Sequence, residues 1–345
     1  MNTVKTNFFL CLISLAAFAQ EIPKSKLKIV AESQFQWTGI AISKTNRVFV
    51  NFPRWSKENP MAVAEIIDGK SIPYPNVKWN TYDMKGNNQF ICVQSMWIDK
   101  QNQLWVLDTG YVLEEDKTNA ATLYVFDLLQ NKLKTSYTIP AESITARSYL
   151  NDFRVDEKHQ KVYFTDSRLG GLVIFDLMTQ TAKRILSNHF STLAELPQIV
   201  VEGYERKRAV HSDGIELDKN QKYLYYCALT GENVYRIPVK AILDENNNDI
   251  ALGLKVEKFA KTGPNDGILF DKKGTLYLSS LEKNAISVAD KKGKCKTLIA
   301  DALIQWPDSF ALNKEGDVYF TTSQIHLPKD KRGTYKIMKL ASTLK

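Results

Sequence analysis

Six polar residues, three of them aspartates, recur at one position of a repeated sequence pattern, and this position is the strongest candidate for chemistry. The residues are Thr38, Gln94, Asn151, Asp213, Asp266 and Asp308. Like charges held close together either bind a cation or raise one another's pKa. A carboxyl group with a raised pKa can act as an acid or a base near neutral pH. The pattern therefore predicts a site that binds a cation or transfers protons, with Asp213 and Asp266 as catalytic candidates.

Each of the six residues opens a similar stretch of sequence. Four mostly apolar or small residues follow it, then Asp, Asn or Ser, a short polar turn, and a segment rich in Val, Leu, Tyr and Phe. The turn residue always stands five positions after the opening residue, at Ser43, Asp99, Asp156, Asp218, Asp271 and Asn313. Such a stretch is typical of a β-hairpin. Successive openings lie 42 to 62 residues apart.

Repeats of about fifty residues with four strands each indicate a β-propeller. Further strand-like segments, such as 122–128 and 233–239, fill the intervals between the hairpins. We therefore predict an all-β fold, a six-bladed β-propeller with four antiparallel strands per blade, in one domain over residues 20–345. The first strand of each blade lines the central channel, so the six opening residues are expected to form a ring near one mouth. The alternative is that they only cap strand ends and bond backbone amides.

Other residues near the ring are candidates for the same site. His211 lies two positions before Asp213 and is able to shuttle protons, although a histidine in a loop is usually just solvated. Trp37 and Trp306 lie beside repeat openings, where aromatic faces would suit an aromatic or cationic amine ligand. Their alternative role is core packing between blades. The segment 187–210 is expected to form either a short helix over one channel mouth or a loop between blades.

The N-terminus has the features of a cleaved export signal over residues 1–19. A positive Lys5 precedes an apolar stretch at 8–17, and Ala17 and Ala19 flank Phe18 in the small-x-small pattern that a signal peptidase cuts. We expect the mature chain to begin near Gln20 and to be secreted or periplasmic. The apolar stretch is too short to span a bilayer, and no membrane insertion is expected.

Composition and motifs exclude several classes of function. The net charge of +8 comes from scattered basic residues with no aromatic-interleaved patch, so no nucleic-acid partner is expected. The chain contains no GxSxG, HExxH, Walker or dinucleotide fingerprint. Beyond the signal, the odd count of Cys92, Cys227 and Cys295 leaves at least one thiol unpaired. The oligomeric state is not predicted.

Several stretches resemble the major royal jelly protein/yellow family over nearly the whole mature chain. They are 48–55 (VFVNFPRW), 72–76 (IPYPN), 92–110 (CVQSMWIDKQNQLWVLDTG), 162–177 (VYFTDSRLGGLVIFDL), 213–238 (DGIELDKNQKYLYYCALTGENVYRIP) and 305–320 (QWPDSFALNKEGDVYF). The resemblance implies a six-bladed propeller, which agrees with the repeat count. It also implies roles in nutrition, in pigmentation with dopachrome-converting activity, or in binding of biogenic amines in the channel. A fold alone does not fix a function.

At the blade openings the sequence is more distantly similar to gluconolactonase-type propellers, which hold a divalent metal with a Glu, an Asn and an Asp. Asn151 with Asp152 resembles their Asn-Asp motif, and Asp213-Gly214 and Asp266-Gly267 resemble their Asp-Gly motif. This likeness implies a metal site at Asn151, Asp213 and Asp266. Calcium is the expected ion, because these residues with Asp308 and waters could supply six or more oxygens. The first blade lacks the ligand Glu and carries residues 36–39 (QWTG) instead.

Three functions are compatible with the sequence. The leading hypothesis is a propeller that binds a small organic ligand, aromatic, amine or catechol-like, at the channel mouth, with or without isomerase activity. The second is a metal-dependent, lactonase-like hydrolase in which Asp266 or His211 handles the proton. The third is a non-catalytic interaction scaffold. The missing Glu favours binding over hydrolysis, whereas the two Asp-Gly pairs favour a metal.

Overall fold

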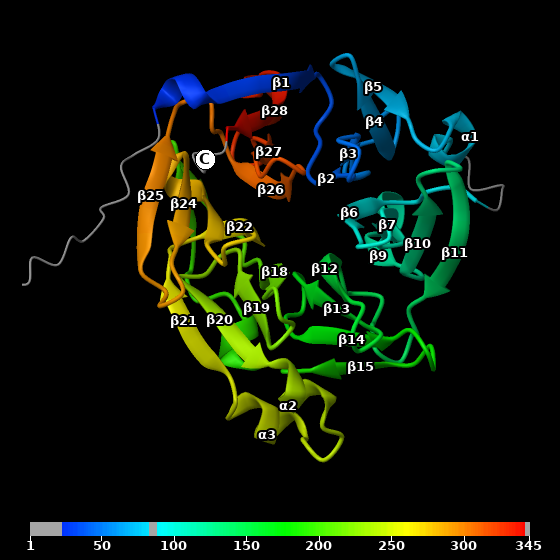
Figure 1. The fold of residues 1–345 in the computed structure, drawn as a ribbon, viewed down its shortest axis with the longest axis vertical. Helices are drawn as coiled ribbons and strands as arrows, with labels where there is room; N and C mark the ends of the chain where they lie inside the picture. The colour runs from blue at the N-terminus through cyan, green and yellow to red at the C-terminus, as the bar shows by residue number, and fades with distance from the viewer. Residues whose placement is uncertain (1–22, 83–87, 342–345) are drawn as a thin grey trace, which may run out of the picture.

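The computed structural model describes residues 23–82 and 88–341. Over these residues the chain forms six four-stranded antiparallel sheets that surround a central axis as the blades of a propeller (Figure 1). Each blade begins at the axis and ends at the rim of the molecule. The predicted fold class is confirmed. The predicted signal at residues 1–19 lies outside the described residues.

The strands follow one another from the axis outward in blades one to five. Blade one consists of β2 (Ile40–Ile42), β3 (Val48–Asn51), β4 (Val63–Ile67) and β5 (Lys70–Pro73). Blade two consists of β6 (Val93–Ile98), β7 (Gln103–Asp108), β10 (Thr122–Asp127) and β11 (Lys132–Thr138). Blade three consists of β12 (Leu150–Asp156), β13 (Lys161–Asp166), β14 (Leu172–Asp176) and β15 (Ala182–Ile185). Blade four consists of β18 (Ser212–Leu217), β19 (Tyr223–Ala228), β20 (Asn233–Pro238) and β21 (Glu257–Lys261), and blade five of β22 (Asn265–Phe270), β23 (Leu276–Ser280), β24 (Ala285–Ala289) and β25 (Cys295–Ala300).

Blade six closes the ring with strands from both ends of the described chain. It consists of β26 (Pro307–Leu312), β27 (Val318–Thr322), β28 (Tyr335–Leu340) and β1 (Leu27–Ser33). The outermost strand β1 pairs antiparallel with β28 over the registers Leu27 to Leu340 and Ser33 to Tyr335. The blue β1 and red β28 lie side by side in Figure 1. This pairing joins both ends of the described chain in one blade and so holds the ring closed.

Short elements decorate the blades. Two small hairpins are β8 (Tyr111–Val112) with β9 (Lys117–Thr118), and β16 (Ile199–Val201) with β17 (Tyr204–Arg206). The helices are α1 (Val77–Asn80), α2 (Val239–Leu243) and α3 (Asp249–Gly253), with 3₁₀ turns at Lys24–Lys26, Leu113–Glu115, Phe190–Thr192, Leu281–Lys283 and Lys329–Lys331. Within the described residues, no helix has the length and apolar character needed to cross a membrane.

Apolar side chains between neighbouring blades form the core. Between blades two and three, for example, Leu123, Phe153, Phe164 and Phe175 are completely buried in one cluster. Burial of a side chain of this size contributes about 1.5–3 kcal/mol, so the alternation of large apolar residues in the second and third strands holds each blade to the next.

A β-bulge in the inner strand takes the ring residue out of the ladder in five blades. In blade four, the pairing of β18 with β19 skips from Ser212 to Ile215, which leaves Asp213 and Gly214 outside it. The same interruption falls at Gln94, at Asn151 and Asp152, at Asp266 and Gly267, and at Asp308 and Ser309. Bulges of this kind re-aim side chains, and here they turn the ring residues toward the axis.

Hydroxyl groups of the second strands replace the ladder bonds that the bulges lose. The Ser279 Oγ accepts from the Asp266 N–H at 2.8 Å and donates to the Gly267 carbonyl at 3.0 Å. Thr165 Oγ1 accepts from the Asp152 N–H at 3.1 Å and donates across blades to the Asp213 carbonyl at 2.6 Å. The backbone groups beside these bulges therefore stay satisfied although they are buried.

The glycine after each of two ring aspartates is required by the packing of inner strands. A Cβ on Gly214 would lie 2.4 Å from the carbonyl oxygen of Asp266, and a Cβ on Gly267 would lie 2.4 Å from that of Asp308. Any larger residue would force neighbouring blades apart at the axis. Close approach of the inner strands thus accounts for the two Asp-Gly pairs in the sequence.

Candidate functional site

A cavity of about 460 Å³ opens at one mouth of the channel, which we call the acidic mouth after Asp213, Asp266 and Asp308. Five of the six predicted ring residues line this cavity, together with Trp306: Gln94, Asn151, Asp213, Asp266 and Asp308. All five are buried at the inner ends of their strands. The size falls within the range of small-molecule pockets, which is 300–1,000 Å³.

The structure places three predicted site residues away from the lining of this cavity. Thr38 is buried, and its hydroxyl accepts from Asn51 Nδ2 at 3.0 Å. Trp37 lies in the core beside Phe52, as its alternative role required, and its Nε1–H donates to the Lys336 carbonyl. His211 is half-buried, and its Nδ1 accepts from the Ala194 N–H at 2.9 Å, so that nitrogen carries no proton in this arrangement.

The three carboxyl groups of the acidic mouth hold their protons more tightly than ordinary aspartates. Burial raises the pKa of Asp213 well above its usual value, and the charges of Asp266 and Asp308 raise it further. Burial likewise raises the pKa of Asp308, with Asp266 adding to the shift. The pKa of Asp266 is raised by burial to about 6, while hydrogen bonds from Trp306 and Asp213 oppose the rise. The charge of Asp266 therefore favours the protonated form of Asp213.

Trp306 is fixed beside this pair. Its Nε1–H donates to Asp266 Oδ2 at 2.8 Å. The Arg206 guanidinium lies 5.3 Å from the centroid of its ring, and the His326 ring lies 5.8 Å away and nearly parallel to it. The backbone of Trp306 has a φ of +54°, a left-handed conformation that is costly for a bulky residue. Strain of this kind persists where the surroundings over-determine a conformation, often at functional sites.

On the opposite wall, amide and hydroxyl groups form a chain of hydrogen bonds. Gln94 Nε2 donates to Asn151 Oδ1 at 2.6 Å, and Tyr149 donates its hydroxyl proton to Gln94 Oε1 at 2.7 Å. Trp55 Nε1–H donates to the Tyr149 oxygen at 2.7 Å. These hydrogen bonds hold the Trp55 and Tyr149 side chains against the cavity, and the amide oxygens of Gln94 and Asn151 each accept one of them.

Arginines lie around the cavity, and sequence reasoning missed them. Arg206 and Arg208 belong to the segment 187–210, which forms a 3₁₀ turn and the β16–β17 hairpin rather than the short helix expected as one alternative. Arg168 also lines the cavity and pairs with Asp116 of the β8–β9 hairpin. The length of the excursion at 187–210 was the only signal for these residues. The last residues of this segment, Arg206, Arg208 and Val210, line the cavity.

Asn151, Asp213 and Asp266, which the sequence implied as metal ligands, all line the acidic mouth. Across 23–82 and 88–341, no group of three or more His, Cys, Asp or Glu side chains is positioned to hold a metal ion. Asn151 Oδ1 and Asp266 Oδ2 already accept hydrogen bonds from Gln94 and Trp306. We derive no step through a metal, and the calcium site stays a prediction from the sequence.

Comparison with known proteins gives a family match. The model of the family described as Major royal jelly protein matches residues 91–334, more than two thirds of the chain. Major royal jelly protein 7 of Apis mellifera is 27% identical over 212 residues, 57% of this chain and 47% of that protein. Major royal jelly protein 2 of the same species is 26% identical over 249 residues, 65% of this chain and 54% of that protein. The chain thus spans about half the length of these curated relatives.

Solved structures share the fold at low sequence identity. A luciferin-regenerating enzyme superposes with a TM-score of 0.58 at 11% identity, covering 92% of this chain and 95% of its own. A gluconolactonase from Xanthomonas campestris superposes with a TM-score of 0.56 at 13% identity, covering 91% and 89%. At such identities the likeness establishes the fold and carries no function to this chain.

Proposed function

The chain belongs to the major royal jelly protein family, and from that premise we propose that it binds a small aromatic amine at the acidic mouth of its propeller channel. The observation that carries the proposal is the cluster of Asp213, Asp266 and Asp308, buried together and facing one cavity. A ligand ammonium group between the three carboxylates would offset their mutual repulsion and would itself be stabilised by their negative charge.

The cations already near the cluster leave room for such a ligand. Arg168 pairs with Asp116, and Arg206 donates to the Ile325 carbonyl at 3.3 Å. Arg206 lowers the pKa of Asp266 through space, but none of the three carboxylates forms an ion pair with a described side chain. Buried carboxylates without a paired cation are costly to maintain, which supports a role in recognition rather than in folding.

The walls favour an aromatic body on the amine. Trp55, Tyr111, Tyr149 and Trp306 line the cavity beside Leu229. Aromatic faces attract both flat apolar rings and cationic groups. Because Asp266 has a pKa of about 6, it can also accept and return a proton near neutral pH, as an isomerisation of a catechol-derived ligand would require. Isomerase activity is therefore part of the proposal, secondary to binding.

A matched pair of ligands tests the proposal. We expect 2-phenylethylamine to bind the wild-type chain and 2-phenylethanol, which lacks the charge, to bind at least tenfold more weakly at pH 8. Asp213→Asn and Asp308→Asn should each weaken the amine by about 10- to 100-fold, the range for loss of one hydrogen bond to a charged group. The measurement is titration of tryptophan fluorescence, which Trp55 and Trp306 at the cavity should report.

Asp290→Asn is the control, because Asp290 lies in an exposed turn and accepts from the Lys292 and Lys294 N–H groups. It should bind the amine as the wild type does. Equal affinity for the amine and the alcohol, or full affinity in Asp213→Asn and Asp308→Asn, would contradict the proposal and leave the interaction scaffold as the better account.

Chelation separates amine binding from the lactonase-like alternative. The same titration after treatment with a chelator should give unchanged affinity, and the melting temperature should not move. Elemental analysis showing about one calcium per chain, with loss of stability on chelation and recovery when the metal is restored, would support the metal site instead.

A further inference from the structure

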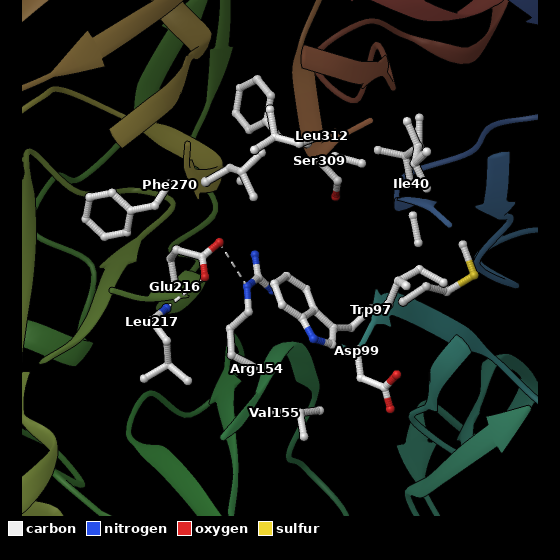
Figure 2. A pocket seen from close by; sticks show the side chains of 18 of the residues that line it. Ile40, Trp97, Asp99, Arg154, Val155, Glu216, Leu217, Phe270, Ser309 and Leu312 are labelled. Atoms are coloured by element: carbon white, nitrogen blue, oxygen red, sulfur yellow. Dashed lines mark hydrogen bonds and ion pairs between the residues drawn. The ribbon is translucent and has the colours of Figure 1, made fainter. Parts of the chain in front are cut away.

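The opposite mouth of the channel carries a second cavity, of about 520 Å³, at the ends of the inner strands where the hairpin turns begin. The turn residues stand five positions after the ring residues, which is about 16 Å along an extended strand. Figure 2 shows this cavity, with Ile40, Val155, Leu217, Phe270 and Leu312 around the opening. None of these residues belongs to the acidic mouth.

A buried ion-pair network closes the inner end of this cavity. Arg154 reaches across the channel from blade three and donates to the Ile268 carbonyl of blade five at 3.3 Å. Its guanidinium lies 3.0 Å from Asp152 and 3.2 Å from Glu216, and it covers the face of Trp97 at 4.6 Å. One of the dashed lines in Figure 2 joins Arg154 to Glu216. Asp152, Arg154 and Glu216 line this cavity and not the acidic mouth, so the network forms the floor of this cavity.

Lysines surround the outer end. The residue directly after the turn residue is a lysine in five blades, and all five lysines line the cavity and are exposed: Lys44, Lys100, Lys219, Lys272 and Lys314. The sixth position is Glu157. We call this opening the lysine mouth.

Hydrogen bonds hold these lysines along the opening. Lys44 Nζ donates to the Lys100 carbonyl, and Lys272 Nζ donates to the Lys314 carbonyl at 3.1 Å. The aspartates of the same turns are engaged with their own backbone. Asp99 accepts from the Gln103 N–H, and Asp271 accepts from the Lys273 and Thr275 N–H groups. Two of the lysines also pair with glutamates, Lys100 with Glu157 at 3.9 Å and Lys314 with Glu315 at 3.6 Å. Lys44, Lys219 and Lys272 are therefore the exposed cations that a ligand meets at this opening.

An apolar cavity with a closed floor and a cationic opening matches one kind of molecule. We propose that the lysine mouth binds a straight-chain aliphatic carboxylate, with the carboxylate among the lysines and the alkyl chain along the channel axis. Charge complementarity favours an anionic head group at the opening, and the apolar walls favour a hydrocarbon tail. Buried Glu216 and partly exposed Asp152 at the floor disfavour a second anionic group there, so we expect a monocarboxylate rather than a dicarboxylate.

Calorimetric titration of the full chain with hexanoate, octanoate and decanoate tests this site. Affinity should rise with chain length by up to about fourfold per added methylene, with one decanoate per chain. Decanol should bind more weakly than decanoate. Equal affinity for hexanoate and decanoate would overturn the proposal, because the alkyl chain would then contribute nothing to binding. Equal affinity for decanol and decanoate would also overturn it, because the carboxylate would then make no contact with the lysines.

Charge variants at the opening give predictions of opposite sign. Lys219→Gln combined with Lys272→Gln should weaken decanoate several-fold, and Glu157→Lys should strengthen it by completing the ring. Lys258→Gln is the matched control, because Lys258 is exposed on the outer strand β21 and should leave binding unchanged. Unchanged affinity in both opening variants would overturn the assignment of the carboxylate to this mouth.

Two further variants locate the alkyl chain. Leu312→Trp narrows the cavity and should remove the gain from hexanoate to decanoate, with thermal unfolding recorded to confirm that the variant is folded. Asp213→Asn should bind decanoate as the wild type does, since Asp213 lies at the other mouth. Loss of decanoate binding in Asp213→Asn would place the ligand at the acidic mouth and overturn the proposal, whatever the outcome for the amine.

Discussion

Replacing Arg154 with methionine is expected to lower the free energy of unfolding by about 3–5 kcal/mol, the usual cost of removing one partner from a buried ion pair. Arg154 is buried at the centre of the channel between Asp152 and Glu216. Burial opposes its charge, yet the two carboxylates together raise the pKa of Arg154. Methionine would fill a similar volume and leave both carboxylates without their cation.

Thermal unfolding measures this effect, with an expected fall in melting temperature on the order of 10 °C. Arg147→Met makes the same change at an exposed position and should shift the melting temperature little. Adding Glu216→Gln to Arg154→Met should recover part of the loss, because one uncompensated charge is removed. A loss below about 1 kcal/mol in Arg154→Met would mean that the network is solvated and does not close the channel.

Replacing Asp266 with asparagine is expected to stabilise the folded chain at pH 8 and to leave its stability nearly unchanged at pH 4. The pKa of Asp266 is raised by burial from 3.8 to about 6 in the folded state. The folded state therefore binds the proton more tightly than the unfolded state, and this contribution to stability is present below pH 4 and lost as the pH rises through 6. A shift of this size corresponds to roughly 3 kcal/mol at pH 8.

Asparagine removes that cost while keeping an oxygen for the Trp306 Nε1–H. Chemical denaturation of the variant and the wild type at both pH values gives the two differences. Asp290→Asn should behave in the opposite sense, because turn N–H groups hold the pKa of Asp290 below its usual value and its charged form stabilises the fold. If Asp266→Asn lowered the free energy of unfolding equally at pH 4 and pH 8, the ionised carboxylate of Asp266 would not be what destabilises the folded state at high pH.

The fold followed from the sequence because a propeller repeats one local rule. Each hairpin turn carries an Asp, Asn or Ser that accepts the N–H groups of its own turn, as Asp99 and Asp271 do. Each blade therefore contains one such turn residue, and the number of these residues in the sequence gives the number of blades.

The candidate site was only partly predictable. A bulge re-aims the ring residue in five blades, whereas β2 of blade one begins only at Ile40, so Thr38 stays bonded to Asn51. That difference depends on backbone register, which the repeat pattern does not record. From the sequence alone, Trp37 and Trp306 were equally good candidates for the lining of the cavity. Of the two, only Trp306 lines it, and the backbone of Trp306 has a left-handed conformation.

The arginines and the lysine mouth show two further limits of predicting a site from the sequence. Arg206 ends an inserted hairpin and Arg208 follows it, and because this insertion follows no repeat, no periodic pattern marked either residue. The lysines did follow the repeat, directly after the turn residues, but their meaning depends on the fold. Only when six blades surround one axis do lysines about fifty residues apart meet at one opening.

The measurement that tests the central claim most directly is the affinity for 2-phenylethylamine by calorimetry between pH 5 and pH 8, in two buffers of different ionisation enthalpy. The ammonium group stays protonated throughout, so only the protein titrates. With Asp266 at a pKa of about 6, affinity should rise about tenfold from pH 5 to pH 7, and binding should release protons. An affinity that stays constant or falls with rising pH, or binding without proton release, would contradict recognition of the amine by the buried carboxylates.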